Sequence, residues 1–239
     1  MFYVCSDIHG HLDKFKKMLD VIGFSPDDQM YVIGDAIDRG PRPIETLLYI
    51  FSHQNITFLP GNHEMMMLEA RGREEEVWME NGGRVTYRQL QRLSDDQRSA
   101  LFRKIKKCPV VIPDVLVNRR KFYLVHALPI SFVIERPLLY DQCTTDMLNQ
   151  CLWERRFTKF GDHPSDIYAT NVLQRYRNYT VIVGHTPTSR SEYGVVKSNG
   201  QPRISRTHHG HLINIDCGCA GGKNLGCLRL DDFKEYYVD

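Results

Sequence analysis

The most restrictive feature of this sequence is a short loop, residues 34–40, which reads GDAIDRG and follows an apolar run at residues 30–33. The run is short and partly β-branched, and a glycine stands at each end of the loop, so the pattern predicts a buried strand followed by a tight turn. Asp35, Asp38 and Arg39 would then lie at the carboxyl end of a strand, where open α/β sheets bind their ligands. Taken alone, the loop is equally compatible with a turn whose aspartates bond their own backbone.

Two other apolar runs end in the same way. Residues 2–5 and 56–59 each read as a short strand that leads directly into polar side chains, which are Asp7, His9, Asn62 and His63. Apolar residues at helical spacing follow the first two strands. This order predicts a βαβαβ core, in which parallel strands bring all three loops to one edge of the sheet.

The three loops would gather several negative charges at that edge. Asp7, Asp35 and Asp38 need a balancing charge, which divalent metal ions supply well. Mixed oxygen and nitrogen donors without a thiolate suit manganese, iron or zinc better than magnesium. Because Asp35 has a donor loop on each side, its carboxylate could bridge two ions roughly 3.5–4 Å apart.

Two later histidines extend the candidate donor set. Residues 121–125 and 180–184 are strand-like runs that lead directly to His126 and His185. A single histidine after a strand is more often a structural or solvent-facing residue. Two such histidines, in a chain that already has three polar loops, favour a role as metal ligands.

Five short motifs occur in a fixed order along the chain: Asp-x-His-Gly, Gly-Asp-x-x-Asp-Arg-Gly, Gly-Asn-His-Glu, His-Ala and Gly-His-Thr. Together they resemble the calcineurin-like metallophosphoesterases of the PPP phosphoprotein phosphatase family, and residues 212–218 resemble the last core strand of that family. The compact length and the His-Ala-Leu-Pro form of the fourth motif are similar to the bacterial and bacteriophage branch, which includes the lambda phosphatase. The resemblance covers nearly the whole chain and implies an α/β fold of two mixed β-sheets, packed as a sandwich and flanked by helices.

The resemblance also implies a set of metal ligands. Asp7 and His9 would bind one ion, Asp35 would bridge to the second, and the other ligands of the second ion would be Asn62, His126 and His185. The implied cofactors are two divalent ions, manganese first, with iron or zinc as alternatives. Two departures from the family pattern, which remove no ligand but leave the loop shape and substrate access unpredicted, are Ser6 and Leu128.

The remaining implied roles concern the phosphate and the leaving group. Asp38 and His63 would form an acid dyad, in which His63 protonates the leaving group while Asp38 holds its other ring nitrogen. Arg39 would bind phosphate oxygens. A second phosphate-binding arginine is expected shortly after Trp153, and the candidates, in order of preference, are Arg155 and Arg156.

These assignments predict a dinuclear-metal phosphomonoesterase, and within that class a protein phosphatase that acts on phosphoserine or phosphothreonine through metal-activated water. Its partners would be phosphorylated proteins or small phosphoesters. Symmetrical dinucleoside tetraphosphate hydrolases resemble the same motif series and are the main alternative, although the Gly-His-Thr-Pro stretch favours the phosphatases. A non-catalytic scaffold of the same fold would be expected to lack a ligand or the acid dyad, and every one of these positions is occupied.

Composition argues against several other classes of protein. The 31 Lys and Arg residues nearly balance the 29 Asp and Glu residues, so a dedicated nucleic-acid or membrane surface is not expected. No basic and apolar leader opens the chain, and no apolar run approaches the roughly 20 residues that span a bilayer. Seven cysteines at scattered spacings predict a reducing, cytoplasmic setting. Cys217 and Cys219 lack the second pair that a zinc site would need.

The whole chain, residues 1–239, is expected to form one domain. Residues 64–107 predict a helical layer beside the sheet, and residues 109–117 and 121–125 predict a hairpin that opens a second sheet. Residues 129–177 read as an irregular segment that would lie over the metals as a cap. The final third is expected to supply antiparallel strands, at residues 195–196, 212–215 and 225–230.

Overall fold

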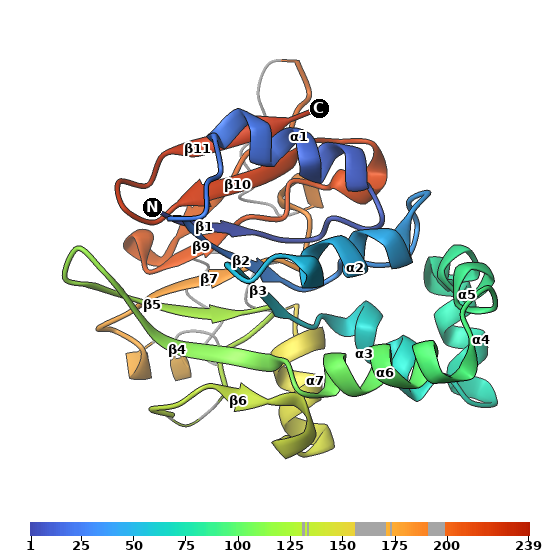
Figure 1. The fold of residues 1–239 in the computed structure, drawn as a ribbon. Coiled ribbons are helices and arrows are strands. Elements are labelled where there is room, and N and C mark those ends of the chain that lie inside the picture. Colours follow the sequence, from blue (N-terminus) through green and yellow to red (C-terminus); the bar gives the residue numbers. More distant parts are fainter. Residues whose placement is uncertain (131, 133, 156–170, 173, 191–198) are drawn as a thin grey trace.

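The computed structural model describes the chain except for residues 131, 133, 156–170, 173 and 191–198 (Figure 1). Two β-sheets pack face to face, and helices cover their outer faces. The predicted α/β sandwich is therefore confirmed. Within the described ranges, no helix is both long enough and apolar enough to cross a bilayer. The strand predicted at residues 195–196 lies outside the described residues.

The first sheet contains the predicted βαβαβ core. Its elements are, in chain order, β1 (Phe2–Cys5), α1 (Leu12–Ile22), β2 (Gln29–Ile33), α2 (Pro43–Ser52) and β3 (Ile56–Leu59). The three strands are adjacent and parallel, so their carboxyl ends lie at one edge. Two antiparallel strands, β10 (Leu225–Arg229) and β11 (Glu235–Val238), extend the sheet beyond β1.

Local sequence explains the first helix of this core. The buried residues of α1 recur every three or four positions and so share one face, which packs toward β10 and β11; they are Leu12, Phe15, Met18 and Leu19. The helix ends at Gly23, whose φ of 62° is the left-handed conformation common at helix C-termini.

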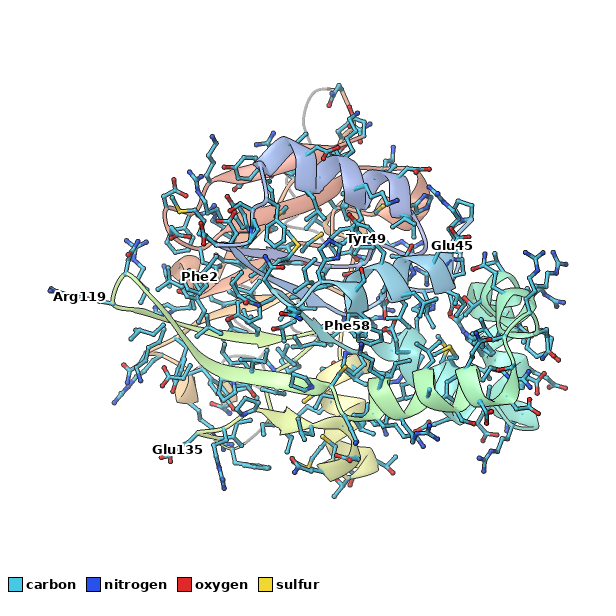
Figure 2. The ribbon with its side chains drawn as sticks, viewed as in Figure 1. Phe2, Glu45, Tyr49, Phe58, Arg119 and Glu135 are labelled. Carbon is cyan, nitrogen blue, oxygen red and sulfur yellow. The ribbon has the colours of Figure 1, made fainter. Side chains whose placement is uncertain are left out.

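The second sheet has the strand order β6, β4, β5, β7, β9, β8. In chain order these strands are β4 (Pro109–Val117), β5 (Arg120–Val125), β6 (Leu138–Leu139), β7 (Thr180–Val183), β8 (Ser205–Thr207) and β9 (Leu212–Asn214). The predicted hairpin is present as β4 and β5, with Arg119 at its tip (Figure 2). Positive φ angles at Asn118 and Arg119 match the turns that tight hairpins favour.

One prediction about strand direction is confirmed only in part. The sequence predicts antiparallel strands throughout the final third of the chain, and β10 fits this expectation. In contrast, β9 runs parallel to β7 and is antiparallel only to β8. Apolar patterning identifies a strand but does not encode the direction of its neighbours, which explains the error.

The central core lies between the two sheets. One buried cluster combines apolar residues of both sheets, among them Val4, Ile33, Leu59, Leu124, Ile182 and Ile213. Other strand residues point outward and pack against helices. Phe58 of β3 (Figure 2) is an example, since its ring lies 5.6 Å from the ring of Phe51 in α2.

Residues 62–106 form the helices of the expected helical layer, which Figure 1 shows grouped on one side of the sandwich. These elements are α3 (Asn62–Glu69), α4 (Arg73–Trp78), a π-helical turn (Met79–Gly83), α5 (Arg84–Leu90) and α6 (Asp95–Lys106). Ser94 caps α6, because its side chain accepts a hydrogen bond from the backbone N–H of Gln97.

The segment at residues 129–177 is more regular than expected. Its described part contains β6 and a helix, α7 (Thr145–Trp153). The side chain of Thr144 accepts a hydrogen bond from the backbone N–H of Met147 and so caps this helix. Three residues of α7 at helical spacing are buried under the second sheet: Leu148, Cys151 and Leu152.

Candidate metal centre and active cleft

The loops that follow β1, β2, β3, β5 and β7 meet at one edge of the sandwich. Their polar side chains are nearly all buried, and several of these residues have positive φ angles, namely Asp7, His9, Asp35, Asp38, Arg39 and His185. Non-glycine residues rarely adopt this conformation, and it persists only where the surrounding structure holds it. The concentration of such residues here marks this edge as the candidate functional site.

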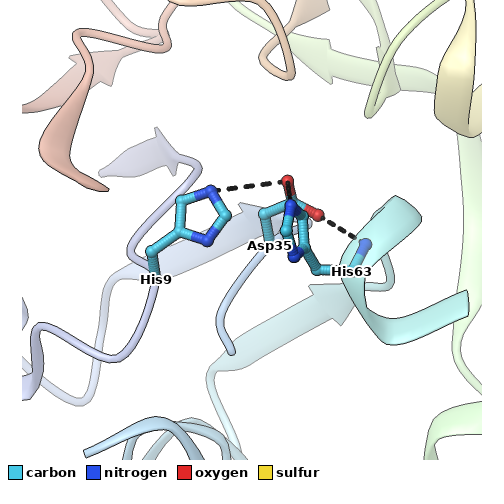
Figure 3. A group of neighbouring side chains, drawn as sticks. All are labelled: His9, Asp35 and His63. Carbon is cyan, nitrogen blue, oxygen red and sulfur yellow. Dashed lines mark hydrogen bonds and ion pairs between the residues drawn. The ribbon is translucent and has the colours of Figure 1, made fainter. Parts of the chain in front are cut away.

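Asp35 lies at the centre of the cluster. Its Oδ2 is 3.6 Å from Nε2 of His9 and 3.9 Å from Nε2 of His63 (Figure 3). Its Oδ1 is 3.4 Å from Nε2 of His126 and accepts a hydrogen bond of 3.1 Å from the backbone N–H of His63. Both oxygens of one carboxylate are thus surrounded by ring nitrogens from separate loops.

Two groups of candidate metal donors share Asp35. The first contains His9, Asp35 and His63, and the second contains Asp35, His126 and His185, with the donor atoms of each group within 4.8 Å of one another. Asp7 and Asn62 border the second group. Oδ2 of Asp7 accepts the backbone N–H of His185 at 3.1 Å, and Oδ1 of Asn62 lies 2.8 Å from Nδ1 of His185.

The structure therefore gathers all six predicted ligands, with two differences in grouping. Asp7, which the resemblance assigns to the same ion as His9, lies beside His185 of the second group. The resemblance pairs His9 with Asp7 and reserves His63 for the acid dyad, whereas here the nitrogen of His63 faces the same oxygen of Asp35 as His9 does. Nε2 of His63 therefore faces the candidate metal site beside Nε2 of His9.

Backbone carbonyls orient two of the imidazoles. Nδ1 of His9 lies 2.9 Å from the carbonyl oxygen of Ile37, and Nδ1 of His126 lies 2.8 Å from that of Ile33. A ring that donates its Nδ1 hydrogen to a carbonyl presents a lone pair at Nε2, which is the arrangement found for histidines that bind metals.

The charges of the cluster fit a pair of divalent cations. Burial lowers the pKa of His9 and His185 well below the usual range, so both rings are neutral, as metal ligands must be. Burial opposes ionisation of Asp35, but His126 and His63 hold the pKa of that carboxyl well below its usual range. Burial also opposes protonation of His126, yet Asp35 and Asp7 raise its pKa to about 9. The carboxylates thus attract positive charge to the place where an ion would bind.

A second hydrogen-bonded group adjoins the donors. Nδ1 of His63 lies 2.7 Å from Oδ2 of Asp38, as the predicted acid dyad requires. Asp38 accepts two further hydrogen bonds, from Nε1 of Trp78 at 2.8 Å and from the hydroxyl of Thr86. Asp38 has no exposed surface, so these contacts fix its carboxylate against the imidazole.

Arg39 donates into the same region. Its guanidinium lies 2.9 Å from Nε2 of both His9 and His63. The π-helical turn holds its backbone, because the Arg39 N–H donates to the carbonyl of Gly82 at 3.2 Å. Gly82 has a φ of 101°, and a β-carbon there would meet Cγ of Arg39 at 2.7 Å, so a glycine is required for this approach.

Arg155 reaches the site from the end of α7. Nη1 donates to the carbonyl of His185 at 3.2 Å and to the hydroxyl of Thr186 at 3.4 Å. Partial desolvation lowers the pKa of this guanidinium, although the charges of Asp35, Asp7 and Asp216 act in the opposite direction. The alternative candidate, Arg156, lies outside the described residues. Leu128 is fully buried in the core under the second sheet, where it does not obstruct the cleft.

These side chains open into a cleft of about 510 Å³. The site residues that line it are His9, Arg39, Arg155 and His185, and its rim adds Glu80, Arg190, Asp216 and Lys223. A larger cavity of about 680 Å³ lies between the C-terminal ends of α1 and α2 and shares no residue with the cleft. The chemistry therefore belongs to the smaller of the two cavities.

The sequence analysis missed Glu64, which fixes two of the loops. Its buried carboxylate accepts backbone hydrogen bonds from Asp35, Ala36 and Ile37 of the second loop, at 2.9–3.2 Å, and from Gly61 of the third at 2.7 Å. Burial, together with the charge of Asp35, raises the pKa of Glu64 to about 7. Its place in the Gly-Asn-His-Glu motif was the signal that could have identified it.

Trp78, Thr86 and Asp216 were also missed. Trp78 and Thr86 come from the helical layer, and no local pattern connects them with Asp38. Asp216 is buried, and its Oδ1 accepts the backbone N–H of Gly218 at 2.8 Å. Burial, and then the charge of Asp7, raises the pKa of Asp216 well above its usual range.

Comparison with known proteins identifies related sequences. The family model for calcineurin-like phosphoesterases matches residues 1–213. A symmetrical bis(5'-nucleosyl)-tetraphosphatase of Pseudomonas fluorescens is 34% identical over 77 residues, which is 31% of this chain and 27% of that relative. The shared segment thus spans only about a quarter of that relative. A protein of the same name from Erwinia tasmaniensis is 22% identical in an alignment that covers 99% of this chain and 96% of the relative.

Solved structures show a similar fold. A cold-active protein-tyrosine phosphatase of a Shewanella species aligns with a TM-score of 0.63 and 17% identity, over 100% of this chain and 80% of that one. A protein serine/threonine phosphatase of Saccharomyces cerevisiae aligns with a TM-score of 0.57 and 17% identity, over 99% of this chain and 78% of that one. At this identity the likeness concerns the fold alone.

Proposed function

Because the chain belongs to the calcineurin-like phosphoesterase family, a family of metal-dependent hydrolases, we propose that it is a dinuclear-metal phosphomonoesterase that acts on phosphoserine or phosphothreonine in proteins. The observation that carries this proposal is the contact of 2.7 Å between Nδ1 of His63 and Oδ2 of Asp38. When a phosphoserine ester is hydrolysed, the serine oxygen departs as an alkoxide, which is a poor leaving group and needs a proton. A buried imidazole with a fixed carboxylate partner is suited to supply it.

The proton would be held at Nε2 of His63. Asp38 accepts the hydrogen bond from Nδ1–H and stabilises the positive charge of the protonated ring, so that Nε2 can give its proton to the departing oxygen. In the structure, that nitrogen accepts a hydrogen bond from Arg39. A bound phosphate would compete for the guanidinium and free the ring for proton transfer.

Arg39 and Arg155 would orient the phosphoryl group. Both side chains line the cleft beside the metal donors. A guanidinium presents two parallel N–H groups, which match two oxygens of a phosphate. With two such side chains in one cleft, the phosphoryl group would be held in a single orientation.

We propose manganese as the metal. Asp7, His9 and Asp35 would hold one ion, and Asp35, Asn62, His126 and His185 would hold the other. When bound, such ions lower the pKa of a water molecule and neutralise phosphoryl oxygens. The mixed nitrogen and oxygen donors suit manganese better than magnesium, which prefers oxygen.

A second candidate function is the hydrolysis of dinucleoside tetraphosphates. Its support is the relative of that name that aligns over 99% of this chain, together with the cationic side chains of the cleft. The leaving group of such a substrate is itself a phosphate and departs readily without a proton. Dependence on the acid dyad therefore separates the two functions.

The test compares kcat/KM for a phosphoserine peptide, a phosphotyrosine peptide and diadenosine tetraphosphate at one metal concentration. We expect the phosphoserine peptide to be the best substrate. A higher value for diadenosine tetraphosphate would favour the second function. No turnover of any of the three would contradict both.

The proposed partners are thus phosphorylated proteins, with no nucleic-acid or membrane surface. All seven cysteines are unpaired, which supports our further proposal of a reducing, cytoplasmic location.

A further inference from the structure

Two cationic side chains of the active cleft take no part in the chemistry proposed above. They are Arg190 and Lys223, and both are exposed and line the same cleft as Arg39 and Arg155. They come from different parts of the chain, one after β7 and the other after β9. Their convergence is therefore a property of the fold and not of one local charged run.

The backbone fixes each of them on the rim. Arg190 ends a short 3₁₀ turn, Thr188–Arg190, and its N–H donates to the carbonyl of Pro187 at 2.8 Å. The N–H of Lys223 donates to the carbonyl of Gly218 at 3.2 Å, and the Lys223 carbonyl accepts a hydrogen bond of 2.8 Å from Nζ of Lys14. Both side chains thus start from ordered turns beside the metal donors.

Within the described part of the chain, neither cation has an acidic partner. Among the residues that the structure describes, no carboxylate forms an ion pair with Arg190 or Lys223. Arg190 is instead close enough to Arg155 for its positive charge to act against that guanidinium. Of the acids that line the cleft, Asp216 is buried and bonded to Gly218, which leaves Glu80 as the exposed one.

Four cationic side chains therefore line the cleft, and Glu80 is the exposed acid among its lining residues. Like charges repel, so this arrangement is stabilised when anions occupy the space between them. A single phosphate bound by Arg39 and Arg155 would use half of the cationic groups. The other half would be left to a second anion.

We propose that Arg190 and Lys223 form a second anion subsite, which binds a further phosphate group of the substrate beside the one that is hydrolysed. The proposal rests on the proposed function, because it places the first phosphate between Arg39 and Arg155. The second phosphate has two chemical sources. It is the next phosphate of a polyphosphate chain, or it is a second phosphoserine in the same peptide.

The first experiment measures binding without turnover. Calorimetry on manganese-loaded protein, at buffered free manganese, gives the Kd of methylenediphosphonate, which has two phosphonates joined by carbon, and the Kd of methylphosphonate, which has one. The variant is Arg190→Gln/Lys223→Gln. The control, Lys17→Gln/Arg88→Gln, removes the same charge from exposed positions away from the cleft.

We expect wild type and the control to bind the diphosphonate about tenfold or more tightly than the monophosphonate, as two charge-assisted contacts would give. In Arg190→Gln/Lys223→Gln the ratio should fall toward one. Arg190→Lys should retain part of it, because the charge remains without the fork. An unchanged ratio in the double variant, or no preference in wild type, would overturn the subsite.

The second experiment identifies the source of the phosphate. It compares wild type with Arg190→Gln/Lys223→Gln. The value measured is kcat/KM for diadenosine tetraphosphate, for a singly phosphorylated peptide and for the same peptide with a second phosphoserine. The substrate that loses most in Arg190→Gln/Lys223→Gln is the one that uses the subsite. Failure of the proposed phosphatase function would appear as no turnover of either peptide, whereas the calorimetry would still report the subsite.

Discussion

Nε1 of Trp78 donates a hydrogen bond of 2.8 Å to Oδ2 of Asp38, the same oxygen that lies 2.7 Å from Nδ1 of His63. Trp78 and His63 thus share one oxygen of Asp38, and a tryptophan of the helical layer helps to set the direction of that carboxylate. The layer and the βαβαβ core must both be in place before the imidazole is oriented.

Replacement of His63 separates proton transfer from metal chemistry. His63→Asn should reduce kcat/KM roughly 10²–10⁴-fold on a phosphoserine peptide, the range for a positioned acid. The loss should be far smaller on 4-nitrophenyl phosphate, whose phenolate leaves without a proton. Asp38→Asn should follow the same pattern more weakly. Both substrates are measured at equal metal content, and an equal loss on both would mean that His63 serves metal or phosphate binding.

Trp78 tests the orientation of the dyad directly. Trp78→Phe removes the donor to Asp38 and keeps an aromatic ring, so we expect a loss of about three- to tenfold on the phosphoserine peptide, the value of one hydrogen bond. The loss on 4-nitrophenyl phosphate should be smaller. The thermal midpoint of the variant controls for unfolding, and equal losses on both substrates would show that Trp78 acts only through stability.

The guanidinium of Arg155 is expected to bind two oxygens of the phosphate through two parallel N–H groups. Arg155→Lys should therefore lose most of the activity that Arg155→Ala loses, because an ammonium cannot reproduce the fork. KM for the phosphoserine peptide should rise in both. Activity of Arg155→Ala equal to wild type, with Arg156→Ala impaired, would move the role to Arg156.

Glu64 is expected to matter for stability more than for substrate binding. Glu64→Gln replaces one acceptor oxygen with an NH₂ group that faces backbone donors, which should lower the free energy of unfolding by about 2–5 kcal/mol. Glu69→Gln, an exposed change on the same helix, should alter it by less than about 0.5 kcal/mol. Urea unfolding of the metal-free proteins gives both values, and equal midpoints would refute the role of Glu64.

The part of the structure that the sequence predicts is the part built from local pattern. Each of β1, β2 and β3 is a short apolar run followed by polar residues, so strand, loop and candidate ligand can be read together. Parallel pairing then follows from the helices between the strands. This rule gathers Asp7, Asp35 and Asn62 at one edge of the first sheet. His126 and His185 come from the second sheet, so their approach to Asp35 depends on how the two sheets pack.

The missed features depend on contacts between distant segments. Trp78 and Thr86 come from the helical layer, and nothing in their local sequence says that both meet Asp38. The direction of β9 likewise depends on its pairing with two other strands, β7 and β8. The helix α7 was a different kind of error, because Thr144 as a cap and the spacing of Leu148, Cys151 and Leu152 were readable signals.

Metal dependence tests the central claim most directly. Protein stripped of metal, as shown by elemental analysis, is titrated with manganese while the hydrolysis of the phosphoserine peptide and the number of bound ions are followed together. We predict no hydrolysis in the stripped protein, recovery as two ions bind, weaker recovery with magnesium, and little recovery in Asp35→Asn, which lacks the shared anionic ligand. Full hydrolysis by the stripped protein would contradict the proposed site and its chemistry.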